Sequence, residues 1–225
     1  MFARARNQPN AYEGSDMHKL YFSIVIILST FLPVFSQASS PQPNQSNCSL
    51  TQSPVIRGVR LGMSTDEVLA ILPSGPESQN NKSAIASADR PPNFGVARLS
   101  FHSMFYYPAV ERFAGVNSMS ITLLDGHVVD LTVSYSGPNT NPRGPYWNSI
   151  DDFVTKLSEG FGLPASGYWQ YKVEYLKALS CSTFAIEATI LNHEGSIRLH
   201  INGYEETLRQ RAAAEEERLR REFKP

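Results

Sequence analysis

IRGVRLGMSTDEVL, residues 56–69, is the stretch that decides how this chain folds. Its pattern predicts a short strand that turns at a glycine and leads directly into a capped helix. Ser64 stands at the N-cap position, and Glu67 three residues later completes a capping box. Met63 and Val68 have the spacing of a hydrophobic staple. We expect targeting sequence and linker before this stretch and one folded module after it.

The composition is that of a globular protein without a strong electrostatic field. Of the 225 residues, 41% are hydrophobic and 18% are charged, and the formal net charge is −1. These fractions are typical of folded domains. A nearly neutral chain without blocks of like charge has little to attract nucleic acid, so we expect no nucleic-acid partner.

Residues 1–38 have the layout of a secretory signal peptide. An uncharged apolar run spans residues 20–35, His18 and Lys19 precede it, and small residues allow a cut after Ala38. The alternative is an uncleaved membrane anchor, although the run contains Pro33 and falls short of the roughly 20 residues that span a bilayer. We therefore expect a secreted or periplasmic protein, or one anchored to the membrane through this segment alone.

Residues 39–55 are a linker rich in serine, proline and glutamine, and they contain Cys48. The second of the two cysteines is Cys181. Two cysteines in an oxidising compartment more often pair than stay free, so we favour a Cys48–Cys181 disulfide. Closing such a long loop is worth roughly 4–5 kcal/mol in the chain-entropy model. The alternative is a buried Cys181 with an exposed and unrelated Cys48.

Residues 56–203 form the predicted α+β domain. Its first helix covers residues 65–72 and ends at Pro73. Residues 74–93 are polar and rich in turn formers, and a structureless loop of this length is usually either functional or disordered. We favour disorder. Alternating apolar residues then predict a strand over residues 97–101.

A β-hairpin is predicted around Asp125-Gly126, with strands over residues 118–124 and 128–135. Pairing Leu123 with Val129 and Ile121 with Leu131 places every apolar side chain on one face of the hairpin. A strict two-residue turn would mix the faces, because a shift of one residue reverses a strand. We therefore predict a three-residue loop or a bulge beside the turn.

The second half of the domain repeats this order of elements. Its helix begins at residue 148 or 149 and ends at Gly160 or Gly162. The helix openings STDEVL (64–69) and SIDDFV (149–154) are alike, which favours two tandem units over residues 56–136 and 147–203. The alternative is that capping boxes look alike in unrelated helices.

Further strands are predicted from alternation over residues 169–173, 184–190 and 197–201, with a four-residue hairpin loop over residues 192–195. Residues 204–225 then form a charged C-terminal helix with i,i+4 ion pairs Glu205–Arg209, Glu216–Arg220 and Glu217–Arg221. The predicted class is α+β, with an antiparallel sheet packed by short helices.

Residues 61–73 (LGMSTDEVLAILP) resemble the G-M-[ST]-x-[DE]-[EQ]-V opening of small bacterial envelope modules. These include the BamE/SmpA-like outer-membrane assembly lipoproteins and the repeats of the β-lactamase inhibitor protein. The hairpin sequence LDGHVV (124–129) suits the same pattern. The resemblance implies short helices packed on an antiparallel sheet and a role in binding other proteins. It implies no catalytic residues.

Sequence motifs predict no catalytic, cofactor-binding or metal-binding residues. The five histidines lack ligand spacing, and the chain has no nucleophile elbow, phosphate-binding loop or dinucleotide fingerprint. Trp147, Trp169 and the aromatic residues 105–107 either form an exposed recognition patch or pack within the fold, and we favour packing.

The leading functional hypothesis is an extracytoplasmic, non-enzymatic protein-binding or envelope-assembly module that works through the free face of its sheet. The alternatives are a secreted hydrolase whose active site carries no motif and a membrane-anchored structural protein. A cleft that holds a histidine with a strongly shifted pKa beside a carboxylate or hydroxyl would favour the enzyme. An open, apolar sheet face without such a cleft would favour the binding module.

Overall fold

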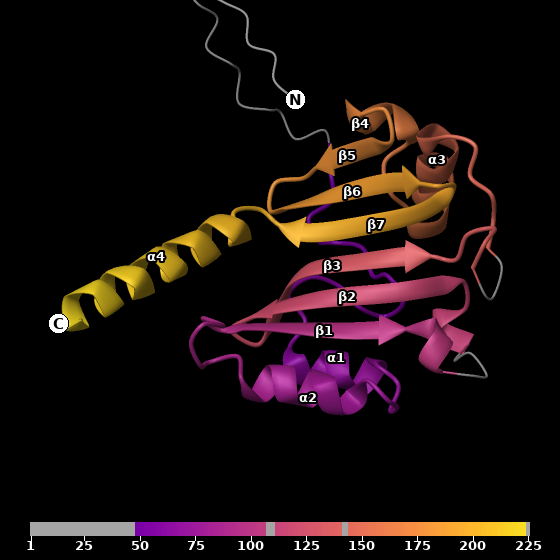
Figure 1. Ribbon diagram of the computed structural model, residues 1–225. Helices are drawn as coiled ribbons and strands as arrows, with labels where there is room; N and C mark the ends of the chain where they lie inside the picture. Colours follow the sequence, from indigo (N-terminus) through magenta and orange to yellow (C-terminus); the bar gives the residue numbers. More distant parts are fainter. Residues whose placement is uncertain (1–47, 107–110, 141–143, 224–225) are drawn as a thin grey trace, which may run out of the picture. The chain divides into compact units, whose positions relative to one another are not determined.

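The computed structural model describes residues 48–106, 111–140 and 144–223 (Figure 1). They form a seven-stranded antiparallel sheet with the strand order β1-β2-β3-β7-β6-β5-β4. The strands are β1 (Val96–His102), β2 (Val116–Leu124), β3 (His127–Tyr135), β4 (Gln170–Val173), β5 (Leu176–Ser180), β6 (Phe184–Leu191) and β7 (Glu194–Ile201). The α-helices are α1 (Thr65–Ile71), α2 (Ser78–Ala86), α3 (Ile150–Phe161) and α4 (Tyr204–Glu222). The predicted α+β class is confirmed.

The capping box that opens α1 is formed as predicted. Glu67 accepts a hydrogen bond from the backbone N–H of Ser64 at 2.7 Å, and the Ser64 hydroxyl accepts one from the Glu67 N–H at 3.4 Å. The disordered loop predicted for residues 74–93 is wrong, because α2 lies within it. This helix is almost uniformly polar, so its pattern gives no periodic signal, and its contacts with β1 hold it in place.

The β2–β3 hairpin combines a two-residue turn with a bulge, which confirms the second of the two predicted solutions. Ile121 pairs with Leu131 as predicted, but Leu123 pairs with Val128 rather than Val129. The pairing shifts by one residue between Thr122 and Leu123. Asp125 and Gly126 both have positive φ angles, 50° and 77°, as a type I′ turn requires.

One prediction in the second half is wrong, and one strand was not predicted. The predicted four-residue loop over residues 192–195 is a two-residue turn, and β5 had no prediction. Asn192 and His193 have φ angles of 50° and 66°, and Glu194 already pairs with Leu191. Helix α3 agrees better with its prediction, since Ser149 caps it and Gly162 ends it in the left-handed conformation. The tandem-unit interpretation stays a prediction, with the two halves joined where β3 pairs with β7.

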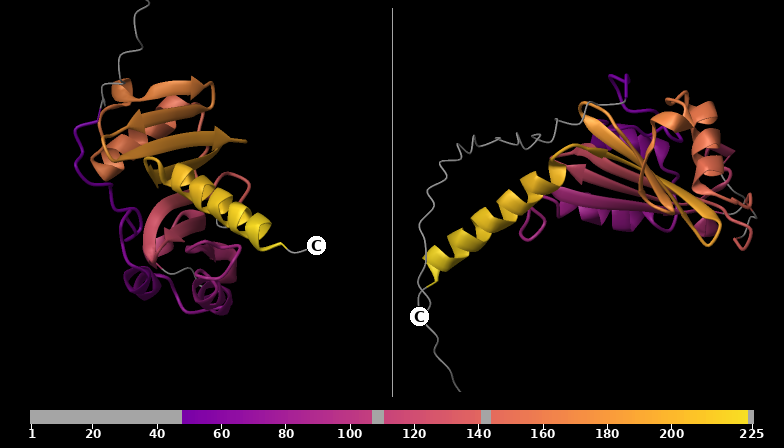
Figure 2. Two further views of the ribbon diagram at one scale, coloured as in Figure 1. Left: turned by 90° about the vertical axis from the view of Figure 1, so that its left-hand side faces the viewer. Right: turned by 90° about the horizontal axis from the view of Figure 1, so that it is seen from above.

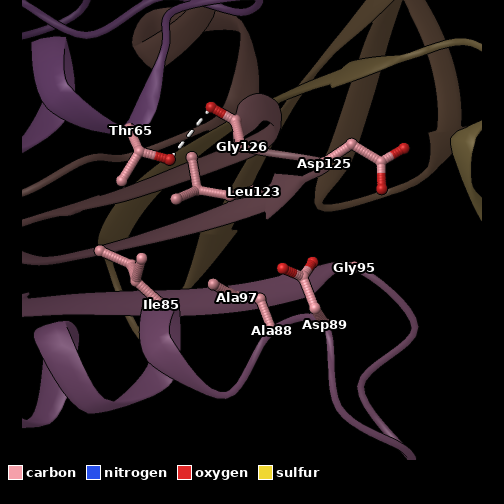
Figure 3. A pocket seen from close by; sticks show the side chains of 9 residues that line it. All are labelled: Thr65, Ile85, Ala88, Asp89, Gly95, Ala97, Leu123, Asp125 and Gly126. Atoms are coloured by element: carbon pink, nitrogen blue, oxygen red, sulfur yellow. Dashed lines mark hydrogen bonds between the residues drawn. The ribbon is translucent and has the colours of Figure 1, made fainter.

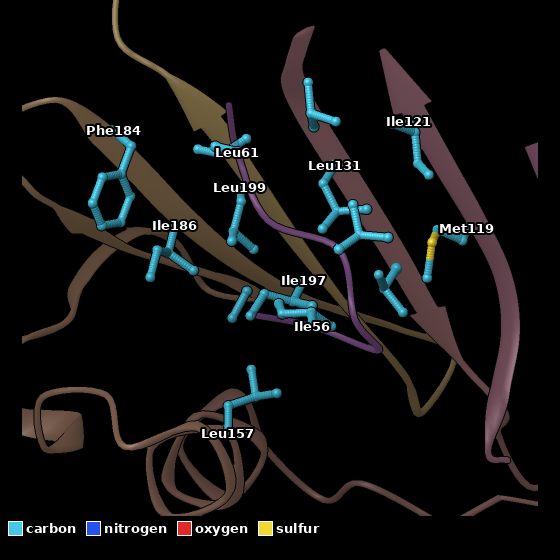
Figure 4. Close-up of a cluster of buried hydrophobic side chains, with 14 of the residues drawn as sticks. Ile56, Leu61, Met119, Ile121, Leu131, Leu157, Phe184, Ile186, Ile197 and Leu199 are labelled. Carbon is cyan, nitrogen blue, oxygen red and sulfur yellow. The ribbon is translucent and has the colours of Figure 1, made fainter. Parts of the chain in front are cut away.

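One face of the sheet carries the hydrophobic core (Figure 4). The segment that precedes α1 runs across this face, and its Ile56 and Leu61 lie over the side chains of Ile197 and Leu199. Leu157 of α3 closes the core over the second half. The fold-deciding stretch therefore covers the middle of the sheet before it enters α1.

The predicted disulfide between Cys48 and Cys181 is present. It closes a sequence separation of 133 residues and ties the start of the described chain to the turn between β5 and β6. A structural disulfide is typical of an oxidising, extracytoplasmic environment. The predicted signal peptide or anchor, residues 1–38, lies outside the described residues, and within the described ranges we find no helix that is both long and apolar enough to cross a membrane.

Helix α4 leaves the end of β7 and extends away from the sheet (Figure 2). Near its middle, Arg211 forms a bidentate ion pair with Asp125 of the hairpin turn, at 2.8 and 2.6 Å. The pairs Glu216–Arg220 and Glu217–Arg221 form as predicted. The predicted Glu205–Arg209 pair is wrong, because Glu205 binds Arg198 of β7 and Arg209 binds Glu206.

Candidate interaction surfaces

The face of the sheet opposite the core is polar, so it is not the open, apolar face that would favour the protein-binding hypothesis. Its cross-strand rows carry small hydroxyl side chains: Ser100, Ser118, Ser120, Thr122, Thr132, Ser134, Thr189 and Ser196. Arg198 crosses this face and contacts Asp130 at 2.6 Å and Glu187 at 3.5 Å. Tyr204 of α4 donates a hydrogen bond to the same Asp130 carboxylate at 2.7 Å. This network fixes the start of α4 to the sheet.

The β1 edge of the sheet is sealed by α2. The side-chain amide of Asn81 donates to the Ser100 carbonyl and accepts from the Ser100 N–H, both at 3.0 Å. It therefore takes the place that a neighbouring strand would occupy. Glu77 accepts a hydrogen bond from the His102 N–H at 2.7 Å. Both sealing side chains are buried, so edge pairing at these positions is blocked.

The β4 edge carries no such cover among the described residues and displays exposed apolar side chains. Tyr168, Tyr171, Val173 and Tyr175 are each about half exposed, at 46–57%. Leu191 lies beside them, since the neighbouring Ile190 N–H donates to the Tyr175 carbonyl. An edge strand offers unpaired backbone N–H and C=O groups along its outer side. Tyrosine is also enriched among the residues that carry binding energy at interfaces.

Tyr171 is fixed in place by two residues on the inner side of the edge. Its hydroxyl donates to Asp151 in the first turn of α3, and the ammonium of Lys177 lies 4.2 Å from its ring centroid. Lys177 is buried and also binds Asp151. The hydrogen bonds from Lys177 and then Tyr171 lower the pKa of the Asp151 carboxyl. The edge thus presents a preorganised aromatic ring.

The strand predicted for residues 169–173 forms, but its side chains do not share one buried face. Trp169 is buried and donates a hydrogen bond from Nε1 to the Pro164 carbonyl at 3.1 Å. A register shift between Tyr171 and Val173 interrupts the alternation. Tyr171 lies before this bulge and pairs with Lys177, Val173 lies after it and pairs with Leu176, and both side chains are about half exposed.

The other aromatic residues do not form one patch. Trp147 packs against Phe153 at a centroid distance of 5.0 Å, and Tyr106 is buried. Phe105 is half exposed near the opposite edge of the sheet, and Tyr107 lies outside the described residues. Packing, which we favoured, therefore describes Trp147, Trp169 and Tyr106.

Two histidines of the described residues lie beside a carboxylate: His102 beside Glu77, and His200 beside Glu187 at 3.9 Å. The closer pair, His102 and Glu77, helps to close the β1 edge. His102 Nδ1 is 2.7 Å from Glu77 Oε1, and the Ser100 hydroxyl donates to that same oxygen at 3.0 Å. In a nucleophilic triad the hydroxyl would bind the imidazole instead. Across the described ranges, no group of three or more histidine, cysteine, aspartate or glutamate residues could hold a metal ion.

A cavity of about 390 Å³ opens between α2, the start of β1 and the β2–β3 turn (Figure 3). Ile85, Ala88, Ala97 and Leu123 form its apolar walls, with the carboxylates of Asp89 and Asp125 around it. Arg211 already binds Asp125, and this ion pair lowers the pKa of the Asp125 carboxyl. The cavity therefore holds a neutralised carboxylate and an exposed one, which select for no particular ligand.

Comparison of the chain with known protein families, curated proteins and solved structures finds no match. The class that the structure defines is an α+β domain with one disulfide and two unlike sheet edges.

Proposed function

We propose that this protein is an extracytoplasmic, non-enzymatic binding module that captures an extended segment of a partner protein along its β4 edge. The observation that carries the proposal is the exposed aromatic border of an uncovered edge strand. A partner segment that adds to this edge gains main-chain hydrogen bonds from the strand and side-chain contacts from its flanks.

The pairing pattern favours an extended partner with apolar side chains on both of its faces. Tyr171 follows the cross-strand row that contains Lys177, on the core side of the sheet. Val173 follows the row that contains Leu176, on the polar side. An added strand would therefore meet an apolar contact on each side. Two copies of this chain gain less from each other, because the edge is four residues long and bulged.

The compartment in this proposal rests on the sequence and the disulfide together. We propose that residues 1–38 are removed as a signal peptide, which leaves a secreted or periplasmic protein. The resemblance of residues 61–73 to bacterial envelope modules supports a protein partner in the cell envelope and a role in envelope assembly. A free N-terminus at Ser39, measured by sequencing the protein recovered from its host, tests this part.

The binding site is tested with a variant that places charge on the open edge. Val173→Lys/Tyr175→Lys introduces two ammonium groups beside the edge, where they hinder docking of an apolar strand. Met104→Lys/Phe105→Lys is the matched control, because these residues are also exposed, at 74% and 50%, but lie after β1. A photo-cross-linking residue at position 168, which is also exposed beside this edge, should label a partner in envelope extract, and the labelled segment should be extended.

The proposal predicts that the β4 variant loses the labelled partner while the control variant keeps it. Equal capture by the two variants would overturn the assignment of the edge. Turnover of a generic ester or peptide substrate without any specific partner would favour the hydrolase instead.

A further inference from the structure

A second cavity lies between α3 and the end of β3, away from the β4 edge. Its volume is about 270 Å³, and its walls include Tyr135, Trp147, Phe153, Leu157 and Phe161, with Arg57 beside them. We call this cavity the aromatic pocket. An apolar cavity of about 150 Å³ in a protein core accommodates benzene. The aromatic pocket is therefore large enough for one or two fused rings with a short polar group.

The rings of the aromatic pocket are arranged rigidly around Phe153. Trp147 and Tyr135 contact Phe153 at centroid distances of 5.0 and 6.1 Å, tilted and edge-on. Phe153 is held against the sheet at Gly195, where a Cβ atom would lie 2.5 Å from its ring. A glycine at this position therefore lets the ring approach β7 closely. A planar ligand would meet a preformed aromatic surface.

Three of the lining residues each carry one buried polar atom that has no hydrogen-bond partner within the described parts of the chain. These atoms are the Tyr135 hydroxyl, the Trp147 Nε1 and the Arg57 Nε. The indole and guanidinium nitrogens carry hydrogens and only donate. Burial raises the pKa of Tyr135 to about 12, so its hydroxyl also keeps its proton at neutral pH. A buried donor without a partner costs about 1–3 kcal/mol.

One positive charge without a carboxylate partner among the described residues, that of Arg57, lies beside the aromatic pocket. Arg57 donates to the carbonyls of Ala114 and Arg112 at 2.7 and 3.4 Å, which fixes its guanidinium. No carboxylate of the described residues pairs with it. Lys156 lies at the rim and forms an exposed ion pair with Glu159 at 2.8 Å. Donors and positive charge together favour a ligand with an acceptor and a negative charge, and disfavour a cation.

From these features we infer that the aromatic pocket binds a small aromatic carboxylate. Its ring would contact Phe153 and Trp147, and its carboxylate would accept hydrogen bonds from the unpaired donors. This site is separate from the β4 edge and does not depend on the proposed protein-binding function.

Calorimetric titration of the full chain with 2-naphthoate tests the inference, with 2-naphthylmethanol and 2-naphthylmethylamine as neutral and cationic probes. We expect the acid to bind about ten times more tightly than the alcohol, since its charged acceptor makes stronger hydrogen bonds. The amine should not bind. Acid and alcohol of equal affinity, or no heat from the acid at millimolar concentration, would overturn the inference.

The position of the bound acid is read from the indole N–H resonances, because the chain has two tryptophans. The Trp147 signal should move on addition of 2-naphthoate. The Trp169 signal should stay, because that N–H already donates to Pro164. Trp169→Phe assigns the two signals and should leave the affinity unchanged. Movement of the Trp169 signal alone would place the ligand elsewhere and overturn the assignment.

Two conservative variants test the donors. Tyr135→Phe and Trp147→Phe each keep an aromatic ring and remove one unpaired donor, and each should weaken 2-naphthoate binding about five- to tenfold. Without ligand, Tyr135→Phe should unfold at the same or a higher denaturant concentration, because its hydroxyl has no partner to lose. Unchanged affinity in both variants would show that the donors do not bind the acid.

Discussion

The two edge strands of the sheet, β1 and β4, differ in whether other groups cover their outer backbone. At β1, the side chains of Asn81 and Glu77 bind the backbone of the strand and close it to further pairing. At β4, the residues that flank the strand are exposed tyrosines and a valine. Proteins usually cover or charge their sheet edges, because uncovered edges associate with other chains. The difference supports the proposal that the β4 edge binds a partner, since the β1 edge is closed to one.

The two edges also differ in how they are supported. The β1 edge depends on hydrogen bonds between buried groups, whose loss leaves backbone groups unsatisfied. The β4 edge is fixed from the inside by the contacts of Tyr171 with Lys177 and Asp151, and its half of the sheet is tied by the disulfide. Removing each support in turn should therefore lower the free energy of unfolding by a different amount.

The largest effect is expected for Cys48→Ser/Cys181→Ser. The disulfide closes a separation of 133 residues, so its removal should lower the free energy of unfolding by about 4–5 kcal/mol in the chain-entropy model. Urea unfolding followed by circular dichroism measures this loss. Hydrogen exchange should show β5 and β6 opening before β1 and β2. Equal loss of protection in both halves would contradict the view that the bond supports the open side.

A smaller loss of stability is expected for Asn81→Leu, which removes the side chain that seals the β1 edge. The substitution leaves the Ser100 N–H and C=O without their partner, at a cost of about 2–4 kcal/mol for the two groups. Urea unfolding and exchange of the Ser100 amide measure it. Asn80→Leu provides the control, because that neighbouring side chain is exposed and should tolerate the change. Dimer formation in the Asn81 variant would show that the seal also prevents edge pairing.

Sequence patterns did not predict α2, the helix that seals β1, whereas they did predict the neighbouring β2–β3 hairpin. Asp125-Gly126 and the alternating apolar residues are local signals that predict the hairpin, and even its bulge was one of the two predicted solutions. Helix α2 has neither a strong apolar stripe nor a side-chain cap. Its stability comes from hydrogen bonds to residues about 20 positions away in the sequence, and local propensity does not report such contacts.

The candidate edge was missed for a related reason. The alternation of Trp169, Tyr171 and Val173 predicted a strand but not its place at the edge, and β5 was not anticipated between it and β6. The bulge after Tyr171 and the place of β4 at the end of the sheet decide its exposure, and both depend on tertiary pairing. The tyrosine-rich sequence GYWQYKVEY (167–175) was the available signal.

Asp151→Asn, next to the β4 edge, should cause a moderate, pH-dependent loss of stability. The native carboxyl has a lowered pKa, so its stabilising contribution is present above the unfolded-state pKa of about 3.9 and disappears as the pH falls through the folded-state pKa. At pH 7 we expect a loss of about 1 kcal/mol, because solvent screens a carboxylate that is 54% exposed. Urea unfolding at pH 7 and pH 2.5 measures it, and the difference between wild type and variant should be smaller at the lower pH. A difference as large at pH 2.5 as at pH 7 would assign the effect to lost packing.

The smallest effect on stability is expected for Val173→Lys/Tyr175→Lys, the variant designed to block binding. Both side chains are about half exposed, and exposed positions without special contacts usually change stability by less than about 0.5 kcal/mol. Thermal unfolding should therefore leave this variant close to the wild type, in contrast to Asn81→Leu at the other edge. If the variant instead unfolds as easily as Asn81→Leu, the β4 flank is part of the packed fold and the contrast between the edges fails. Unchanged stability together with lost binding is the result that separates an open edge from a sealed one, since only a surface kept free for a partner can lose its function without losing its fold.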